Sequence, residues 1–187
     1  MMRAGVAALF LAATGPALAG PCPSTISSIV WDDGTTDTVS SRASDMLMLD
    51  SEIAVDGGEH FPIRFRTQAG VIPLWNSGAD GPVSLDWSTP LPAAADLVPG
   101  ATFTLVGSQH AWGEVAPLRL TLIVQAVEQL TVAGCRYEVT RIGMRRDLDQ
   151  DSPEEVQVWL HLPSLLPLRE ASAAADDPWQ RDVVALR

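Results

Sequence analysis

Hydrophobic and polar residues alternate with a period of two along much of the chain, a pattern typical of half-buried β-strands. The longest alternating run covers 118–126, where an apolar residue stands at every even position. Further runs cover 61–65, 103–105, 135–139 and 156–162. Because the short Ala133-Gly134 turn follows the longest run, we expect 118–126 and 135–139 to lie in one antiparallel hairpin.

Turn sequences separate these runs, as at Asp33-Gly34, Asp56-Gly57-Gly58 and Pro99-Gly100. Helical signals are weak, since only 93–96 and the Ala-rich stretch 170–175 favour a short helix. The second stretch is equally compatible with a loop that leads into a last strand at 182–186. The pattern therefore predicts an all-β, antiparallel meander with at most one or two short helices.

Residues 1–19 have the three parts of a secretory signal peptide. Arg3 supplies the positive start, 4–13 is an apolar run too short to cross a bilayer, and Ala17-Leu18-Ala19 is a cleavage site. We predict a signal peptide over 1–19, a single β domain over 20–187 and a periplasmic location. No other stretch reaches the roughly 18 consecutive apolar residues of a membrane span, so the mature chain is expected to have no transmembrane segment.

The chain is acidic, with 12 basic and 23 acidic residues and a formal net charge of −11, and its basic residues are all arginine. A nucleic-acid partner is not expected, because neutralising phosphates requires a basic excess. The lack of lysine excludes a lysine Schiff base and a P-loop lysine. Nothing in the sequence predicts a cofactor.

Cys22 and Cys135 can form one intramolecular disulfide, and export places them where disulfides persist. The bridge would close a loop of about a hundred residues and attach the mature N-terminus to a central strand. Two alternatives are open: free thiols, and a catalytic Cys135 thiol assisted by a histidine. Lipid attachment to Cys22 is disfavoured, because Pro21 rather than a small cleavage-site residue precedes it.

A short acidic motif follows the second strand of the predicted hairpin. Asp147, Asp149 and Asp151 form D-x-D-x-D, a spacing that can supply oxygen ligands to calcium. The EF-hand pattern then needs Gly and Glu, where this chain has Ser152 and Val158. We expect a solvated acidic loop, with weak cation binding as the alternative.

Motifs that carry known catalysis are missing from the sequence. His60, His110 and His161 do not have the spacing of a zinc site, and no G-x-S-x-G motif is present. We therefore assign no catalytic or metal-binding residue and expect that the protein is not an enzyme.

Tryptophan most often serves packing, but alternation places Trp159 off the apolar face that Val158 and Leu160 define. Trp159 is therefore the first aromatic residue that we expect to contact a ligand. Phe65 and Phe103, which stand on the sheet faces of other predicted strands, are expected to join it.

The second half of the chain carries a series of recognisable motifs. The sequence reads VPGATF at 98–103, has Glu128 in the next strand and continues as LTVAGCRYEV at 130–139. A tryptophan-bearing strand, VWLHLP at 158–163, leads to LPLR at 166–169. These motifs resemble those of a group of uncharacterised exported bacterial proteins with an incomplete antiparallel β-barrel. The resemblance covers about half of the chain, with a weaker counterpart in WDDGT at 31–35, and Cys135 replaces the Thr or Ser that the group usually has.

The resemblance implies a single, strongly curved antiparallel sheet that forms an incomplete β-barrel, similar to the half-barrels of periplasmic lipoprotein carriers. Such half-barrels hold an acyl chain in their concave face. The expected function is thus an exported, non-catalytic binding or accessory protein for a lipid, another apolar small molecule or a segment of an envelope protein. One alternative is a structural envelope protein whose own loops and 171–187 tail fill the interior. A less favoured one is a glycan or ester hydrolase.

Overall fold

The computed structural model describes residues 22–55, 59–148, 152–172 and 178–187. Within these ranges the chain forms twelve strands and one short 3-10 helix. The strands are β1 (Ser28–Trp31), β2 (Thr36–Ala43), β3 (Met46–Ala54), β4 (His60–Gln68), β5 (Ile72–Gly78), β6 (Gly81–Trp87), β7 (Thr102–Ala111), β8 (Glu114–Val132), β9 (Cys135–Leu148), β10 (Glu154–His161), β11 (Leu166–Ser172) and β12 (Gln180–Leu186). The 3-10 helix η1 (Ala94–Asp96) lies where a short helix was expected. The predicted signal peptide lies outside the described residues.

The all-β, antiparallel prediction is confirmed. The alternating runs lie in β4, β7, β8, β9 and β10, except that Leu162 falls just after β10, and the expected hairpin joins β8 to β9. The last strand expected at 182–186 is part of β12. Glu170–Ser172 continues β11 instead of starting a helix.

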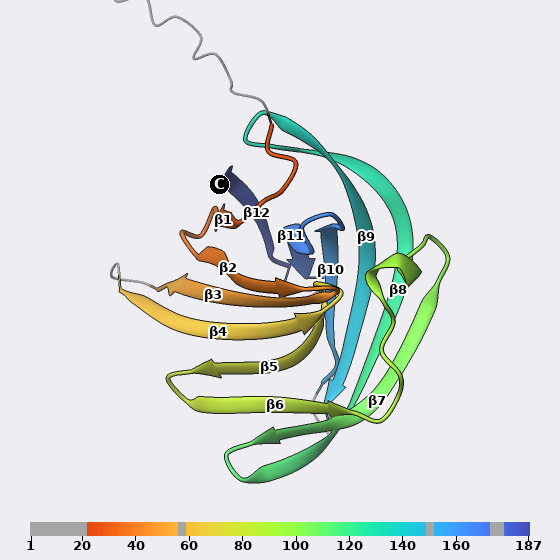
Figure 1. Ribbon diagram of the computed structural model, residues 1–187. Coiled ribbons are helices and arrows are strands. Elements are labelled where there is room, and N and C mark those ends of the chain that lie inside the picture. The colour runs from red at the N-terminus through yellow and green to blue at the C-terminus, as the bar shows by residue number, and fades with distance from the viewer. Residues whose placement is uncertain (1–21, 56–58, 149–151, 173–177) are drawn as a thin grey trace, which may run out of the picture.

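The sheet is a closed barrel, so the prediction of an incomplete barrel is wrong. Every strand pairs with its neighbour in sequence, and β1 then pairs with β12 through Ile29↔Leu186 and Trp31↔Val183. The backbone N–H of Ser27 also donates to the carbonyl of Arg187 at 2.8 Å. This last pairing removes the two free edges that a half-barrel would expose. Figure 1 shows all twelve strands around one interior.

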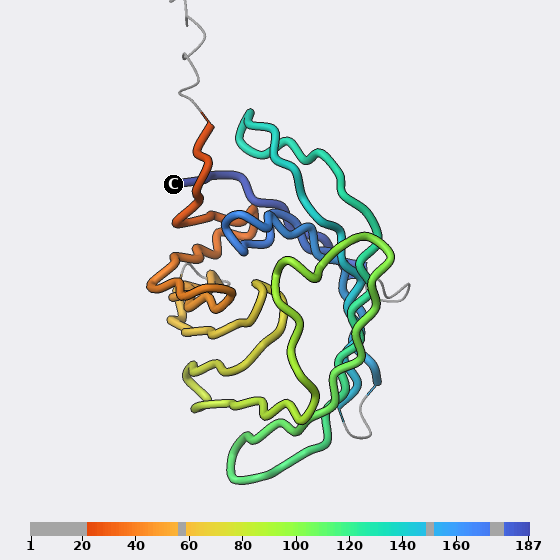
Figure 2. Tube along the Cα trace, turned by 45° about the vertical axis from the view of Figure 1, so that its right-hand side comes forward, coloured from red at the N-terminus to blue at the C-terminus, as the bar shows by residue number. Residues whose placement is uncertain are grey.

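The β8–β9 hairpin is longer than the neighbouring hairpins. One of its faces is buried near the barrel, and the opposite face is buried near its tip. Ile142 and Val139 are both buried although, three residues apart in one strand, they face opposite sides of the ribbon. A bulge at Gln125 keeps the buried residues of β8 at even positions across this change of face. The far half of the hairpin thus curves over the top of the barrel, close to the N-terminal segment (Figures 1 and 2).

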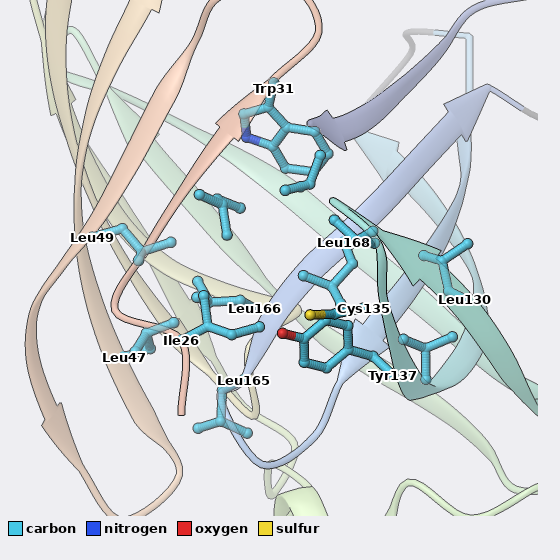
Figure 3. Close-up of a cluster of buried hydrophobic side chains, with 14 residues drawn as sticks. Ile26, Trp31, Leu47, Leu49, Leu130, Cys135, Tyr137, Leu165, Leu166 and Leu168 are labelled. Carbon is cyan, nitrogen blue, oxygen red and sulfur yellow. The ribbon is translucent and has the colours of Figure 1, made fainter. Parts of the chain in front are cut away.

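Two hydrophobic clusters form the core. One joins the hairpin tip to β1, β3 and the β10–β11 turn, and it includes Trp31, Tyr137 and Leu166 (Figure 3). The other lies against β7, β8 and β10 and includes Leu97, Leu122 and Leu160. Each cluster includes residues from turns at the same end of the barrel, such as Leu165 in the first and Ala69 in the second.

We call this the closed end; it is formed by the turns β2–β3, β4–β5 and β10–β11, the β6–β7 connection and the hairpin tip. Leu97 of the β6–β7 connection is 1% exposed, and the Ala94 N–H donates to Asp45 in the β2–β3 turn at 3.2 Å. Gly70 lies so close to the β10–β11 turn that a Cβ there would come within 2.4 Å of the Leu165 carbonyl oxygen. The opposite end, formed by the turns β1–β2, β5–β6 and β7–β8, is called the open end.

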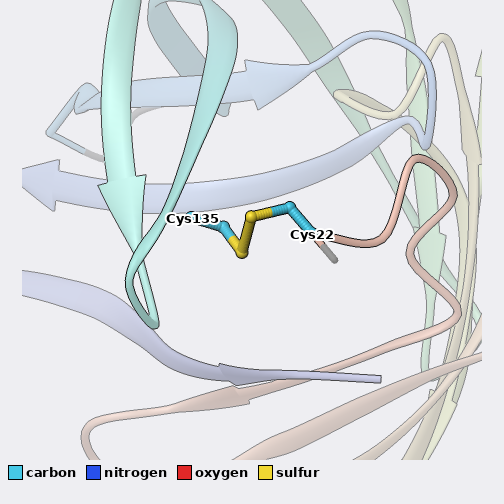
Figure 4. Close-up of a disulfide and its surroundings, with 2 residues drawn as sticks. All are labelled: Cys22 and Cys135. Carbon is cyan, nitrogen blue, oxygen red and sulfur yellow. A yellow bond between two sulfur atoms is a disulfide. The ribbon is translucent and has the colours of Figure 1, made fainter. Parts of the chain in front are cut away.

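A disulfide joins the N-terminal segment to the closed end, which confirms the predicted Cys22–Cys135 pair (Figure 4). The two Cα atoms are 5.6 Å apart although the cysteines are separated by 113 positions. Neither free thiols nor a catalytic thiol is compatible with this bond. Between the bridge and β1, Ile26 is fully buried in the first cluster, so the segment forms part of the core.

Candidate ligand-binding cavity

Two adjoining cavities lie inside the barrel, with volumes of about 230 Å³ and 380 Å³. The smaller one extends from Thr35 at the open end to Gly70 beside the closed-end turns. They share five lining residues, which make them one continuous space: Val71, Met144, Val158, Glu170 and Arg181. Trp179, which is 40% exposed, lines the larger cavity, so the space reaches the surface. Small-molecule sites typically measure about 300–1,000 Å³, and the two cavities together fall in that range.

Apolar side chains make up much of the wall because alternate residues of each strand face the interior. Leu49 of β3 and Phe65 of β4 are directly paired and stand side by side in the smaller cavity. Met144 and Val158 contribute the opposite side from β9 and β10. The wall can therefore contact an apolar ligand from several strands.

A buried carboxylate is fixed in the wall of the smaller cavity. Asp37 of β2 is 8% exposed and accepts a hydrogen bond from the Trp31 indole N–H at 2.7 Å and one from the Ser51 hydroxyl at 2.5 Å. Ser51 lies directly opposite Asp37 in the β2–β3 pair, which brings the two side chains to the same face. The two donors hold the carboxylate in one orientation toward the interior.

An ion pair stands where the two cavities meet. Arg181 of β12 donates to Glu170 of β11 from Nε at 2.9 Å and from Nη2 at 2.6 Å. The two residues are directly paired across the strands, and the Arg181 guanidinium lies 4.1 Å from the centre of the Trp31 ring. Asp33 in the β1–β2 turn is 3.9 Å from Nη1 of Arg181. The guanidinium is thus held by two carboxylates and an aromatic ring.

A third hollow of about 490 Å³ lies at the rim of the open end. Phe61 and Trp112 line it and are 42% and 74% exposed, an unusual exposure for such large apolar side chains. Trp112 is held by a hydrogen bond from its indole N–H to the Asp80 carbonyl oxygen at 2.8 Å. Ile53 lines both this hollow and the smaller cavity, so the rim adjoins the interior.

The structure does not bring the three predicted ligand residues together. Phe65 lines the smaller cavity, whereas Phe103 packs against the second core cluster. Trp159 packs against the first core cluster, where its indole N–H donates to Glu128 at 3.1 Å and Arg169 lies over its ring. A ligand-binding role for these residues stays a prediction, and the interior favours Phe65 among them.

A histidine–serine pair occurs at the closed end, but its surroundings are those of a structural contact. His161 Nδ1 and Ser164 Oγ are 2.6 Å apart, and Ser164 is fully buried in the β10–β11 turn. Burial and the positive charge of Arg42 lower the pKa of His161. A buried serine offers no access to a substrate, so this pair stabilises the turn.

The remaining polar candidates lie on the outer surface. His110 contacts Ser108 at 3.1 Å and Asp86 at 3.2 Å, and His60 is exposed at the start of β4. Asp147 pairs with Arg145, while Asp149 and Asp151 lie outside the described residues. In the part of the chain that the structure describes, no group of His, Cys, Asp and Glu is arranged to hold a metal ion.

The three charged residues that line the smaller cavity, Asp37, Glu170 and Arg181, were not predicted from the sequence. Each occupies an inward-facing strand position, where an alternating pattern would show an apolar residue. Their signal lies in the register of β2, β11 and β12, which brings Asp37 beside Ser51 and Glu170 beside Arg181. Sequence alternation alone does not contain that register.

Comparisons with known proteins show the fold and no family. No protein-family model matches the chain, and no curated protein sequence matches it. None of the helical segments within the described ranges has the length and apolar character needed to cross a bilayer. The crystal structure of the hypothetical lipoprotein YmcC from Escherichia coli (K12) superimposes with a TM-score of 0.51 at 12% identity, covering 90% of this chain and 92% of that one. The chain therefore has the fold of this bacterial protein over nearly its whole length.

Proposed function

We propose that the protein is an exported, non-catalytic binding protein that holds the apolar part of a small molecule inside the barrel. The ligand enters through the open end, where the cavities reach the surface. The observation that carries the proposal is the continuous interior space, bounded by apolar side chains from several strands and closed at one end.

An exported location agrees with the disulfide and with the signal-peptide pattern of the sequence. The fold neighbour is described as a hypothetical lipoprotein, which is in keeping with an envelope protein. A binding role without chemistry is supported by the cavity itself, because its carboxylates and its guanidinium hold one another or neighbouring wall residues. The periplasm is the compartment that we infer from these features together.

Binding can be tested with Nile red, a neutral dye whose fluorescence rises in apolar surroundings. The wild-type protein, purified with its disulfide intact, is expected to bind the dye at micromolar concentration. Met144→Trp places an indole where the two cavities meet and should weaken binding at least tenfold. Val127→Trp, on the exposed outer face of β8, is the matched control and should leave binding unchanged.

Native mass spectrometry of protein taken from its source without reductant provides a second readout. A bound species of several hundred daltons that organic extraction removes would support the proposal. Failure of the wild-type protein to bind Nile red, together with a bare protein mass, would overturn it.

The second candidate is a structural envelope protein with a filled interior. The β6–β7 connection favours it at the closed end, because Leu97 and Ala94 fill space between the core clusters. The last strand of the expected tail, however, does not fill the interior, since β12 forms part of the barrel wall. Absence of Nile red binding, together with a bare protein mass, would favour this structural role.

A further inference from the structure

Resting on the proposed binding function, we infer that the ligand carries a positively charged polar group, an alkylammonium, that lies against Asp37. The inference concerns the chemical class of the ligand in the smaller cavity. It is carried by a buried carboxylate on the cavity wall whose negative charge no cation of the described chain neutralises directly.

Asp37 is more than nine-tenths buried, and it has room for a further partner. Its two hydrogen bonds come from neutral donors, the Trp31 indole and the Ser51 hydroxyl. A carboxylate has about four lone-pair positions, so two are still free to accept. Buried charges in proteins are usually paired, because desolvating an isolated ion is costly. A ligand cation would supply the missing charge.

The other charges on the cavity walls are already matched. Arg181 directs its contacts to Glu170 and Asp33. In the larger cavity, Arg146 lies 3.7 Å from Glu154. Three charged residues line the smaller cavity, Asp37, Glu170 and Arg181, and together they leave one negative charge there. An anionic ligand would add to this charge, whereas an ammonium group would balance it.

The surroundings of Asp37 suit an alkylammonium in particular. Phe65 lines the same cavity and offers an aromatic ring, which attracts a cation through its face. Leu49, Val71 and Val158 provide the apolar surface for the attached chain. The entrance is acidic as well, since Asp32 and Asp80 are exposed at turns of the open end. Long-range attraction thus acts in the same direction as the buried carboxylate.

The test compares three ligands with the same twelve-carbon chain: dodecylamine, dodecanol and dodecanoate. Each displaces Nile red from the full oxidised protein at pH 7.5, below its micelle concentration. An aliphatic amine is protonated at this pH, because its pKa resembles the value of about 10.4 for lysine. We expect dodecylamine to bind about tenfold more tightly than dodecanol and dodecanoate to bind weakest, since a hydrogen bond to a charged group is stronger than a neutral one.

Asp37→Asn removes the charge; its one remaining oxygen can accept the Trp31 indole N–H, and its NH2 group can donate to the Ser51 hydroxyl oxygen. It should lower the affinity for dodecylamine about tenfold and change that for dodecanol less than twofold. Asp50→Asn is the control, because Asp50 carries the same charge on the same barrel wall but faces outward, toward Arg64. Asp37→Glu keeps the charge and should retain the preference for the amine. Circular dichroism and thermal melting establish that each variant is folded.

The outcomes separate this inference from the proposed function. If Nile red and all three ligands bind with no preference for the amine, the binding function stands and the ammonium ligand is wrong. If no ligand binds, the proposed function fails and the inference fails with it. If Asp37→Asn does not fold, the affinities of the wild-type protein for the three ligands still decide between these outcomes.

Discussion

The two ends of the barrel are built from the same antiparallel strands but differ in almost every other respect. At the closed end, turns, a long connection and the hairpin tip pack into two apolar clusters and are joined by a disulfide. At the open end, Trp112 and Phe61 are exposed, acidic turns surround the mouth, and cavities reach inward. The chain thus concentrates its apolar packing and its disulfide at one end, while cavities remain between the strands toward the other.

The difference shows how a barrel of this size can be both stable and hollow. Side chains of twelve strands do not fill the interior completely, because a wider barrel encloses more space than its own side chains occupy. Here, additional segments fill one half. The disulfide, Ile26 and Leu97 belong to that half. Substitutions there are expected to act on stability, and substitutions near the mouth on binding.

Removing the disulfide should have the largest effect on stability. In the chain-entropy estimate, a closed loop of about a hundred residues stabilises the folded state by about 4–5 kcal/mol. The double variant Cys22→Ser, Cys135→Ser is therefore expected to lose about 4 kcal/mol of unfolding free energy in urea titrations. A reducing agent should lower the stability of the wild-type protein in the same way and leave the double variant unchanged. An equally stable variant would show that the closed end does not depend on its covalent bond.

Substitutions at Gly70 in the closed end and Gly113 in the open end test how tightly each end is packed. Gly70 has a φ of 77° and Gly113 a φ of 82°, but a Cβ at Gly70 would strike the Leu165 carbonyl while one at Gly113 would meet no atom within 4 Å. Gly70→Ala is expected to cost about 3 kcal/mol, from backbone strain together with the clash. Gly113→Ala should cost about 1 kcal/mol from strain alone. Urea unfolding of both variants measures the difference, and equal losses would contradict the tight packing assigned to the closed end.

The pH dependence of His161 should give the smallest effect, because it involves a single proton. Burial and Arg42 lower its pKa in the folded state, while Tyr137 and Ser164 contact it without charge. Above the unfolded-state pKa of about 6.5 the imidazole is neutral in both states and its full contribution is present. As the pH falls below that value, the unfolded chain binds the proton first, so stability decreases.

The measurement compares unfolding free energies at pH 7.5 and pH 5.5 for the wild-type protein and for His161→Gln. The wild-type protein is expected to lose more stability over this range than the variant. Parallel losses would show that the carboxylates of this acidic chain, and not His161, account for the pH dependence.

Sequence patterns predicted the strands better than they predicted the closure of the barrel. The alternation at 118–126 and 135–139 is strong, and both runs lie in the expected hairpin. β1 is only four residues long, and its pairing with β12 is interrupted by a register shift after Val30. Such a short pairing between the two ends of the chain leaves almost no periodic signal. The closure of the barrel therefore depends on the register between β1 and β12, which the sequence pattern does not show.

The cavity was predicted in part, and the reason lies in the residue types that line it. Phe65 follows the apolar alternation of β4 and faces the interior. Asp37 and Arg181 face the interior as well, but they are polar, so the alternation pattern assigns them to the outer face. Trp159 was placed off the apolar face defined by Val158 and Leu160, and there it packs against the first core cluster beside Glu128 instead of lining the cavity. The curvature of the sheet, which decides inside from outside, does not appear in a single strand.

The disulfide also has a mechanical consequence. When the oxidised protein is pulled between the N-terminal segment and Arg187, the load passes from Cys22 through the sulfur bond to Cys135. Residues 23–134, which include the eight whole strands β1 to β8, are then enclosed in a covalent loop that force cannot extend. Only the chain beyond Cys135 can be drawn out, so the strands that carry Asp37 and Phe65 are shielded from tension applied at the ends of the molecule.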